Sequence, residues 1–301
     1  MASIDPKSVS TAHFHSVLLT AVAPRPIAFA STIDEKGNVN LSPFSFFNAF
    51  SANPPILVFS PARRVRDNTT KHTLENVLKV PEVVINIVDY PIVEQMSLAS
   101  TEYADGVNEF VKAGFTEVAS EKIRPPRAKE SPVAFECKVL EVKPMGDQGG
   151  AGNLIICEVI LAHVQDHLLN EDSKLDPTKL DLVARMGGNW YTKTNRETMF
   201  EIPKPLTTMG IGFDQLPDHV RNSTVLTGNN LGRLANVEQL PTKEEVLAIA
   251  NEPEVSAILE NFGDDEEGLD RELHLLAQKY LLSDQTNEAW QVLMVNTLES
   301  N

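Results

Sequence analysis

Residues 24–48 read PRPIAFASTIDEKGNVNLSPFSFFN, and this stretch predicts a β-hairpin near the start of the chain. An apolar, β-rich run occupies residues 26–33, and the turn-forming segment 34–38 ends it. The return strand is expected from Val39 to about Phe50. Pro43 lies inside this strand and removes a backbone donor, so we expect an irregular strand whose amides are free to face a ligand.

The next segments alternate between strand-like and short helical patterns. Apolar or β-branched runs predict strands at 56–60, 83–88, 132–143 and 153–165, and short helices are expected around 74–78, 91–99 and 107–113. The glycine-rich residues 145–152 join the two long strands. We interpret them as a hairpin loop, because a nucleotide-binding glycine fingerprint requires a helix after the strand.

The last third of the chain differs in charge and pattern, which predicts two domains, residues 1–200 and residues 201–301. The net charge is -16, and residues 201–301 contain 6 Lys/Arg against 18 Asp/Glu. Residues 201–241 are rich in proline and glycine and are expected to be mostly loop. Thr242 and Glu245 have the spacing of a helix capping box, and further helices are expected at 253–262, 267–281 and 284–297.

Composition excludes several classes of protein. An acidic chain repels phosphate backbones and anionic membrane surfaces, so nucleic acid and membrane partners are not expected. No run of about 18 apolar residues is present, and the short run before Pro24 is not interpreted as a signal peptide. Cys137 and Cys157 lie in apolar runs and indicate core cysteines in a reducing cytoplasm. The pair His13 and His15 lacks nearby third and fourth ligands, so no metal site is expected.

Several short motifs occur in one order along the first two hundred residues. They are PRPIA at 24–28, NLSPFSFFN at 40–48, NPP at 53–55, KHTLEN at 71–76, VVIN at 83–86, GVNEF at 106–110, SPV at 131–133 and RMGGNWY at 185–191. Together they resemble the flavin-reductase-like FMN-binding family, which includes flavoredoxins, over about residues 20–200.

This resemblance implies a mainly β fold with helices, in the α+β class. It implies an FMN-binding split β-barrel that forms a homodimer, with FMN at the dimer interface and the flavin ring over the hairpin. An α-helical C-terminal extension would follow the barrel.

The resemblance also implies flavin contacts in the irregular strand. FMN requires a flat apolar wall and hydrogen bonds to the polar edge of its ring. The residues carried over from the family are Ser42, Phe44, Ser45, Phe46 and Asn48. The alternative interpretation is that the phenylalanines of this strand are core residues.

A basic loop supplies the candidates for binding the phosphate. Arg64, Thr70, Lys71 and Thr73 lie where this loop leads into a helix, and helix N-terminal amides attract anions. The alternative is that these loop cations are only solvated. His72 departs from the family, which often has an acidic residue there.

Four further polar residues carry predictions of their own. His163 matches a histidine that lies near the flavin in relatives, where it could position a nicotinamide or transfer a proton; a plain strand-end histidine is the alternative. Arg185 and Tyr191 could approach the ring. Asn86 lies in an apolar strand, and either a structural partner or the flavin could satisfy its amide.

The leading functional prediction is an FMN-dependent oxidoreductase, with FAD as the less favoured cofactor. NADH or NADPH would donate electrons, and a free flavin, another small molecule or a protein would accept them. The alternative is a flavin-binding electron carrier or flavin-storage protein without turnover of its own, whose acidic tail recruits a partner. The tail could also simply extend the dimer interface.

Overall fold

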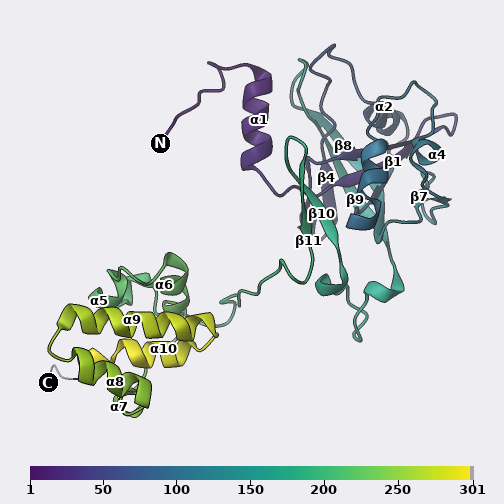
Figure 1. Ribbon diagram of the computed structural model, residues 1–301. Coiled ribbons are helices and arrows are strands. Elements are labelled where there is room, and N and C mark those ends of the chain that lie inside the picture. The colour runs from purple at the N-terminus through teal and green to yellow at the C-terminus, as the bar shows by residue number, and fades with distance from the viewer. Residues whose placement is uncertain (299–301) are drawn as a thin grey trace. The chain divides into compact units, whose positions relative to one another are not determined.

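The computed structural model describes residues 1–298, which form two compact units. The first unit is Met1–Phe200, and the second begins at Glu201. Figure 1 shows a β-rich first unit and an all-helical second unit. The expected α+β class, with a barrel followed by a helical extension, is confirmed.

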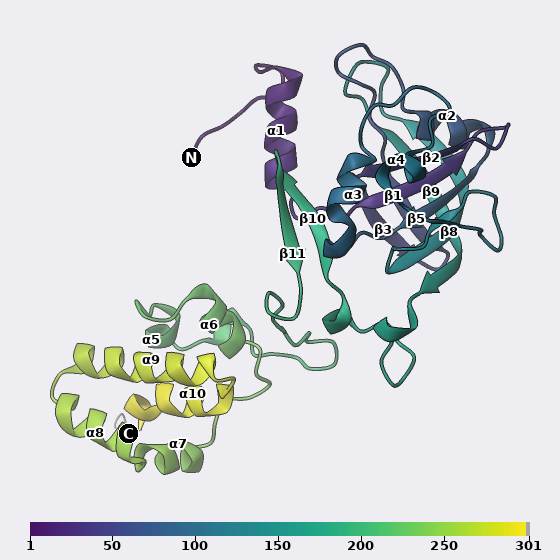
Figure 2. The same cartoon turned by 45° about the vertical axis from the view of Figure 1, so that its right-hand side comes forward.

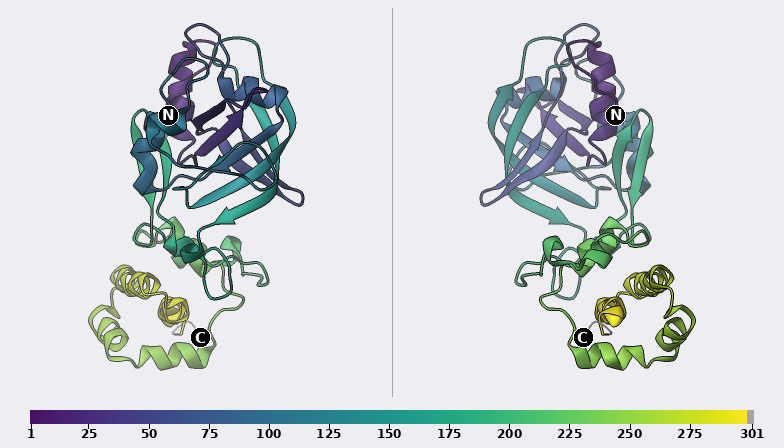
Figure 3. Two further views of the ribbon diagram at one scale, coloured as in Figure 1. Left: turned by 90° about the vertical axis from the view of Figure 1, so that its right-hand side faces the viewer. Right: turned by 90° about the vertical axis from the view of Figure 1, so that its left-hand side faces the viewer.

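One antiparallel sheet of seven strands, in the order β2-β1-β5-β8-β9-β4-β3, forms the first unit. Its strands curve into a barrel, as the two views of Figure 3 show. The strands are β1 (Ala28–Ile33), β2 (Val39–Phe44), β3 (Phe47–Ala52), β4 (Pro55–Phe59), β5 (Glu82–Asn86), β8 (Val133–Pro144) and β9 (Asn153–Val164). A separate small pair is formed by β6 (Glu117–Val118) and β7 (Arg127–Ala128).

The predicted hairpin is confirmed, but the single return strand from Val39 to Phe50 is wrong. β2 pairs with β1 as far as Phe44, which lies opposite Ala28. The chain then crosses to the opposite edge of the sheet, where it forms β3. The physical reason is the start of the partner strand β1. Pro26 has no N–H donor, and β1 begins two residues after it, so residues beyond Phe44 have no strand with which to form ladder hydrogen bonds.

Alternate residues of the strands fill two apolar layers. Ala28, Ala30 and Ile85 belong to a cluster inside the barrel, whereas Phe29 and Leu41 belong to a cluster on the outside. The helices α3 (Val93–Leu98) and α4 (Glu109–Ala113) lie beside β2 and cover the outer cluster (Figure 2). The helix α2 (His72–Lys79) packs on β1 and β2, and its buried residues include Leu74 and Val77.

Asn86 is a buried polar residue of β5, and its side chain has structural partners. The Asn86 side-chain amide donates to the Phe29 carbonyl at 2.9 Å and accepts from the Ala128 amide at 2.9 Å, so the structural interpretation is confirmed. Cys137 and Cys157 are buried and free, which confirms the prediction of core cysteines.

Two elements flank the barrel that the sequence patterns did not predict. The helix α1 (Thr11–Ala21) has no fully buried residue, and the hairpin of β10 (Leu182–Gly187) and β11 (Trp190–Thr194) lies beside it. Arg25 connects them. Its backbone exchanges hydrogen bonds of 3.0 and 2.9 Å with Arg185, and its guanidinium donates to the Val22 carbonyl at 2.6 Å near the end of α1.

The second unit surrounds its own apolar core. Its helices are α5 (Asp218–Arg221), α6 (Gly228–Leu234), α7 (Lys243–Ala250), α8 (Pro253–Phe262), α9 (Glu266–Leu282) and α10 (Thr286–Leu293). Trp290 is 1% exposed in this core, and its indole N–H donates to the Leu234 carbonyl at 3.0 Å. The capping box of Thr242 and Glu245 is confirmed.

The expectation of mostly loop over residues 201–241 is wrong in part, because α5 and α6 lie there. Thr227 and Asn230 form a reciprocal capping box at the start of α6, which offsets the low helix propensity of Gly228 and Asn229.

Within residues 1–298, no helix has both the length and the apolar character needed to cross a bilayer.

Candidate functional site

A small polar cavity lies where α2 begins, beside β2. Its volume is about 30 Å³. The lining residues come from three parts of the chain: Asn40 and Ser42; Arg64, Lys71 and His72; and Ser100, Thr101, Glu102, Tyr103 and Glu109. Three of the residues proposed to bind the cofactor, Ser42, Arg64 and Lys71, are therefore brought together.

The first turn of α2 has unsatisfied donors. Lys71 is the N-cap residue, and its side chain forms no capping hydrogen bond. Among residues 1–298, no acceptor lies within hydrogen-bonding distance of the His72 and Thr73 amides. A helix terminus of this kind attracts anions, because its N–H groups and its dipole both favour negative charge.

Three cationic side chains gather on one carboxylate beside this terminus. Glu102 accepts from Arg64 Nε at 2.8 Å and from Arg66 Nη2 at 2.8 Å, and Lys71 Nζ lies 3.3 Å away. The hydrogen bonds from Arg64, Arg66 and Lys71 lower the pKa of Glu102 to about 2. The Arg64 side chain is 16% exposed and also bonds Thr69 Oγ1 at 2.9 Å and the Thr70 carbonyl, so the loop holds it in place.

The floor of the cavity is a buried polar network on β2. Asn40 Nδ2 donates to Thr73 Oγ1 at 2.9 Å, and Glu109 accepts from the Leu41 amide at 2.9 Å. Burial raises the pKa of Glu109, against the opposing effect of that amide hydrogen bond. The first contact fixes the position of α2 against β2, and the second joins α4 to the same strand.

Two of the predicted phosphate ligands have other partners. The Thr73 side chain is fully buried and accepts from Asn40, so only its backbone amide is left as a donor for an anion. The Thr70 hydroxyl donates to Glu75, and its carbonyl accepts from Arg64. Thr70 therefore orders the basic loop.

The residues expected to border the flavin extend from the end of β2, through the crossing at Ser45 and Phe46, to the start of β3, and their exposure differs. Phe44 packs against Phe59, with ring centroids 5.5 Å apart, and contributes to the barrel core. Phe46 is 38% exposed and meets His15 of α1 edge to face at 6.1 Å. Ser45 is half-buried, and exposed Asn48 bonds the Ala49 amide at 2.8 Å. Of the two phenylalanines that the resemblance predicts to contact the flavin, only Phe46 is exposed at the surface.

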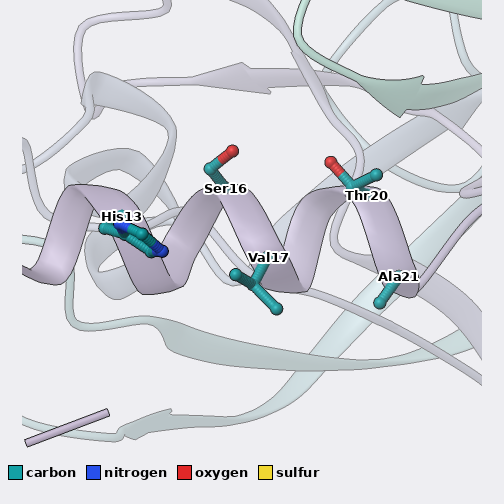
Figure 4. A pocket seen from close by; sticks show the side chains of 5 residues that line it. All are labelled: His13, Ser16, Val17, Thr20 and Ala21. Atoms are coloured by element: carbon teal, nitrogen blue, oxygen red, sulfur yellow. The ribbon is translucent and has the colours of Figure 1, made fainter. Parts of the chain in front are cut away.

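The helix α1 lines a broader hollow. Its volume is about 520 Å³, and because all of its lining residues belong to this one helix it is an open surface and not an enclosed pocket. Figure 4 shows the side chains of α1 that line it: His13, Ser16, Val17, Thr20 and Ala21. Within residues 1–298, no group of three or more His, Cys, Asp or Glu side chains is arranged to hold a metal ion, and His13 and His15 belong to no such group.

His163 does not line the cavity at α2. Across the sheet the register runs from Pro43 through Phe29, Asn86 and Ala134 to His163, so three strands separate β2 from β9 along the curved sheet. Its Nε2 lies 2.7 Å from an oxygen of Glu136. A role for His163 in proton transfer stays a prediction.

Glu136, which His163 contacts, is a buried carboxylate. The Glu136 carboxylate is fully buried and accepts from the Glu121 and Lys122 amides at 2.8 and 2.7 Å. Burial alone raises its pKa, but the amide hydrogen bonds and His163 outweigh that effect and lower it.

Arg185 is also placed away from the cavity. Its guanidinium lies 4.6 Å from the centre of the Tyr191 ring and donates to the Gly188 carbonyl at 2.6 Å. Both contacts are within the β10–β11 hairpin. Its proposed approach to a flavin ring stays a prediction.

Comparison with known proteins assigns the first unit to a family. Residues 21–179, more than half of the chain, match the model of the flavin reductase like domain. The chain belongs to this flavin reductase family. The barrel is therefore the split barrel of that family, as the motifs predicted.

Two further proteins illustrate the similarity of this flavin reductase family member to known chains. An uncharacterized protein from Aquifex aeolicus is 38% identical over 188 residues, which are 62% of this chain and 93% of the relative. The crystal structure of nitrilotriacetate monooxygenase component B from Bacillus cereus is similar, with 28% identity and a TM-score of 0.63. That similarity covers 67% of this chain and 98% of the other.

The family model does not extend into the helical unit, since its match ends at residue 179. Glu102 is the feature of the site that the motifs did not reveal, whereas the helix amides beside the basic loop were expected. Glu102 lies 31 to 38 residues from the cations that it contacts, and no local pattern marks such a contact.

Proposed function

We propose that the protein is an FMN-binding oxidoreductase that accepts electrons from NADH or NADPH and passes them to a small-molecule or protein acceptor. The observation that carries the proposal is the uncapped start of α2, with two unbonded amides and the cations of Arg64 and Lys71 beside it. This donor set suits a terminal phosphate, and it favours FMN over FAD because a phosphate monoester presents three oxygens and up to two charges.

In this proposal the chain holds the cofactor at both ends. The α2 amides, Arg64 and Lys71 bind the phosphate, and the crossing that contains Ser45 and Phe46 supports the ring. When bound, FMN supplies the hydride and electron chemistry. The protein supplies orientation, and the buried contact of Asn40 with Thr73 keeps the phosphate-binding helix at a fixed position along β2.

We also propose a homodimer with FMN at its interface. The edge strand β3 is exposed over Asn48–Ala52, and Phe50 is 67% exposed there. Trp190 is 78% exposed on β11, and α1 has no fully buried residue. A long exposed edge strand with large apolar side chains supports a partner surface, because a monomer usually protects such an edge.

The two free cysteines support a reducing compartment, the cytoplasm.

The alternative function is a flavin-binding electron carrier or store that recruits a partner through the helical unit. That unit has its own core and lies outside the family match, which favours an added task. The barrel occurs without such an extension in the Aquifex relative, of which this chain covers 93% with 188 residues. A shortened protein lacking residues 201–301 is therefore a reasonable comparison.

The deciding experiment mixes the purified flavin-loaded protein with NADH or NADPH in the absence of oxygen. An oxidoreductase loses its visible flavin absorbance with one of the two donors. If neither donor bleaches the full-length protein but one bleaches the shortened protein, the carrier function is favoured. If neither bleaches either protein, the reductase proposal is wrong.

A further inference from the structure

The carboxylate of Glu102 stands where an anion would meet the cations of the cavity. Arg64, Arg66 and Lys71 come from one basic loop, whereas Glu102 follows α3. Within residues 1–298 it is the one carboxylate that contacts all three cations, at 2.8, 2.8 and 3.3 Å. The loop thus already binds an oxyanion, and the chain itself provides that oxyanion.

The lining of the cavity points the same way. The Glu102 carboxylate accepts from Arg64 Nε at 2.8 Å and lies 3.3 Å from Lys71 Nζ, so the cations that would bind a phosphate already have a partner. Glu102 and its neighbours Thr101 and Tyr103 form one wall. A phosphate that reaches Arg64, Lys71 and the α2 amides therefore requires that wall to withdraw.

The segment that carries Glu102 is attached in a way that allows this. Ala99 is buried at its start, and Asn108 caps α4 at its end. Between these anchors the Thr101 amide bonds the Leu98 carbonyl at 3.2 Å within a local turn, and the Glu102 side chain is 40% exposed. Withdrawal of Glu102 would break no hydrogen bond of the sheet.

We propose that Glu102 is an internal competitor for the anion site and determines which ligands bind there. A phosphate monoester displaces it, because a dianion gains more than a single carboxylate from three cations and two helix amides. An uncharged flavin such as riboflavin has no means of displacing it. This inference rests on the proposed function, since it takes the phosphate of FMN as the displacing group.

The test compares Glu102→Gln with the wild-type protein and with Asp105→Asn, a control that removes one acidic charge from the same exposed segment. Apoprotein is titrated with FMN, riboflavin and inorganic phosphate, using flavin fluorescence and calorimetry. An exposed ion pair typically contributes a factor of about 1.4 to 5, so the loss of three predicts a gain on the order of tenfold. The gain is expected for FMN and for phosphate, and it is expected neither for riboflavin nor in Asp105→Asn.

The outcomes separate this inference from the proposed function. If Glu102→Gln leaves the affinities for FMN and phosphate unchanged, or weakens them, Glu102 is no competitor and the inference is wrong. If none of the three proteins binds FMN, the proposed function fails. The phosphate titration still decides in that case: a gain restricted to Glu102→Gln upholds the competition, and equal phosphate binding by all three proteins overturns it.

Discussion

Replacing Lys71 by glutamine removes one charge from the proposed phosphate site with little effect on the fold. The Lys71 side chain is 32% exposed, and its ion pair with Glu102 is 3.3 Å long. An exposed pair of this kind contributes at most about 1 kcal/mol to stability, so the melting temperature of Lys71→Gln should stay close to that of the wild type. A change in ligand binding can then be attributed to the site.

The expected loss of FMN affinity follows from the same exposure. A hydrogen bond to a charged group contributes about 1.5–3 kcal/mol when buried, and an exposed ion pair contributes less than about 1 kcal/mol. Because Lys71 is about one-third exposed, we expect a loss of about 1–2 kcal/mol, or roughly 5- to 30-fold in the dissociation constant for FMN. Riboflavin, which lacks the phosphate, should bind equally to both proteins.

Fluorescence titration of apoprotein with FMN and with riboflavin measures both constants. The difference for FMN should shrink as salt is added, because screening weakens partly exposed charges. Lys79→Gln is the matched control, since Lys79 ends the same helix and lies 3.8 Å from Glu35 on the surface. Equal weakening of FMN and riboflavin, or no weakening of either, would refute the assignment of Lys71 to the phosphate.

Three further predictions concern the two cores. Glu136→Gln should destabilise the barrel by about 2 kcal/mol above pH 5, because it disrupts a buried acceptor of two amides and His163. The pKa of Glu136 is lowered in the folded state, so this contribution is lost as pH falls through that pKa; urea unfolding should give converging stabilities for the two proteins toward pH 3. Burial raises the pKa of Cys157 to about 12 and raises that of Cys137 further, so both thiols should react with a thiol reagent only after unfolding; rapid labelling of the native protein would contradict this. Trp290→Ala should destabilise the helical unit by about 3–5 kcal/mol, seen as loss of helical circular dichroism at lower urea, and an unchanged midpoint would show that the indole is not part of its core.

Local patterns predicted most of the barrel because its strands carry their own signals. The turn 34–38 and the β-branched run that contains Val83–Ile85 fall in the elements expected of them. The break after Phe44 was not predictable from β2 itself, because it depends on where β1 begins. Register between strands is a property of pairs, and one strand's sequence does not contain it.

The missed helices have different physical causes. The helix α1 buries no residue fully, so it lacks the apolar stripe by which a helix is usually identified. The helix α6 contains Gly228 and Asn229, which favour loops, and its start depends on the reciprocal contacts of Thr227 and Asn230. Both helices are stabilised by contacts that a propensity argument does not weigh.

The site was predictable as far as it is local in sequence. The cations Arg64 and Lys71 precede a predicted helix start, and the structure gathers them there with Ser42. Glu102 was not predictable, because it reaches the basic loop only through the placement of α3. The buried Thr73 hydroxyl accepts from Asn40, which lies on a different element, so the helix sequence alone does not reveal this contact.

Binding of the FMN phosphate at the basic start of α2 can be examined by mass spectrometry of the small molecule released from freshly purified protein. We expect FMN to be released, and we expect apoprotein to take up added FMN more tightly than riboflavin. A colourless protein that binds neither flavin, or one that releases only FAD, would show that α2 is no FMN phosphate site.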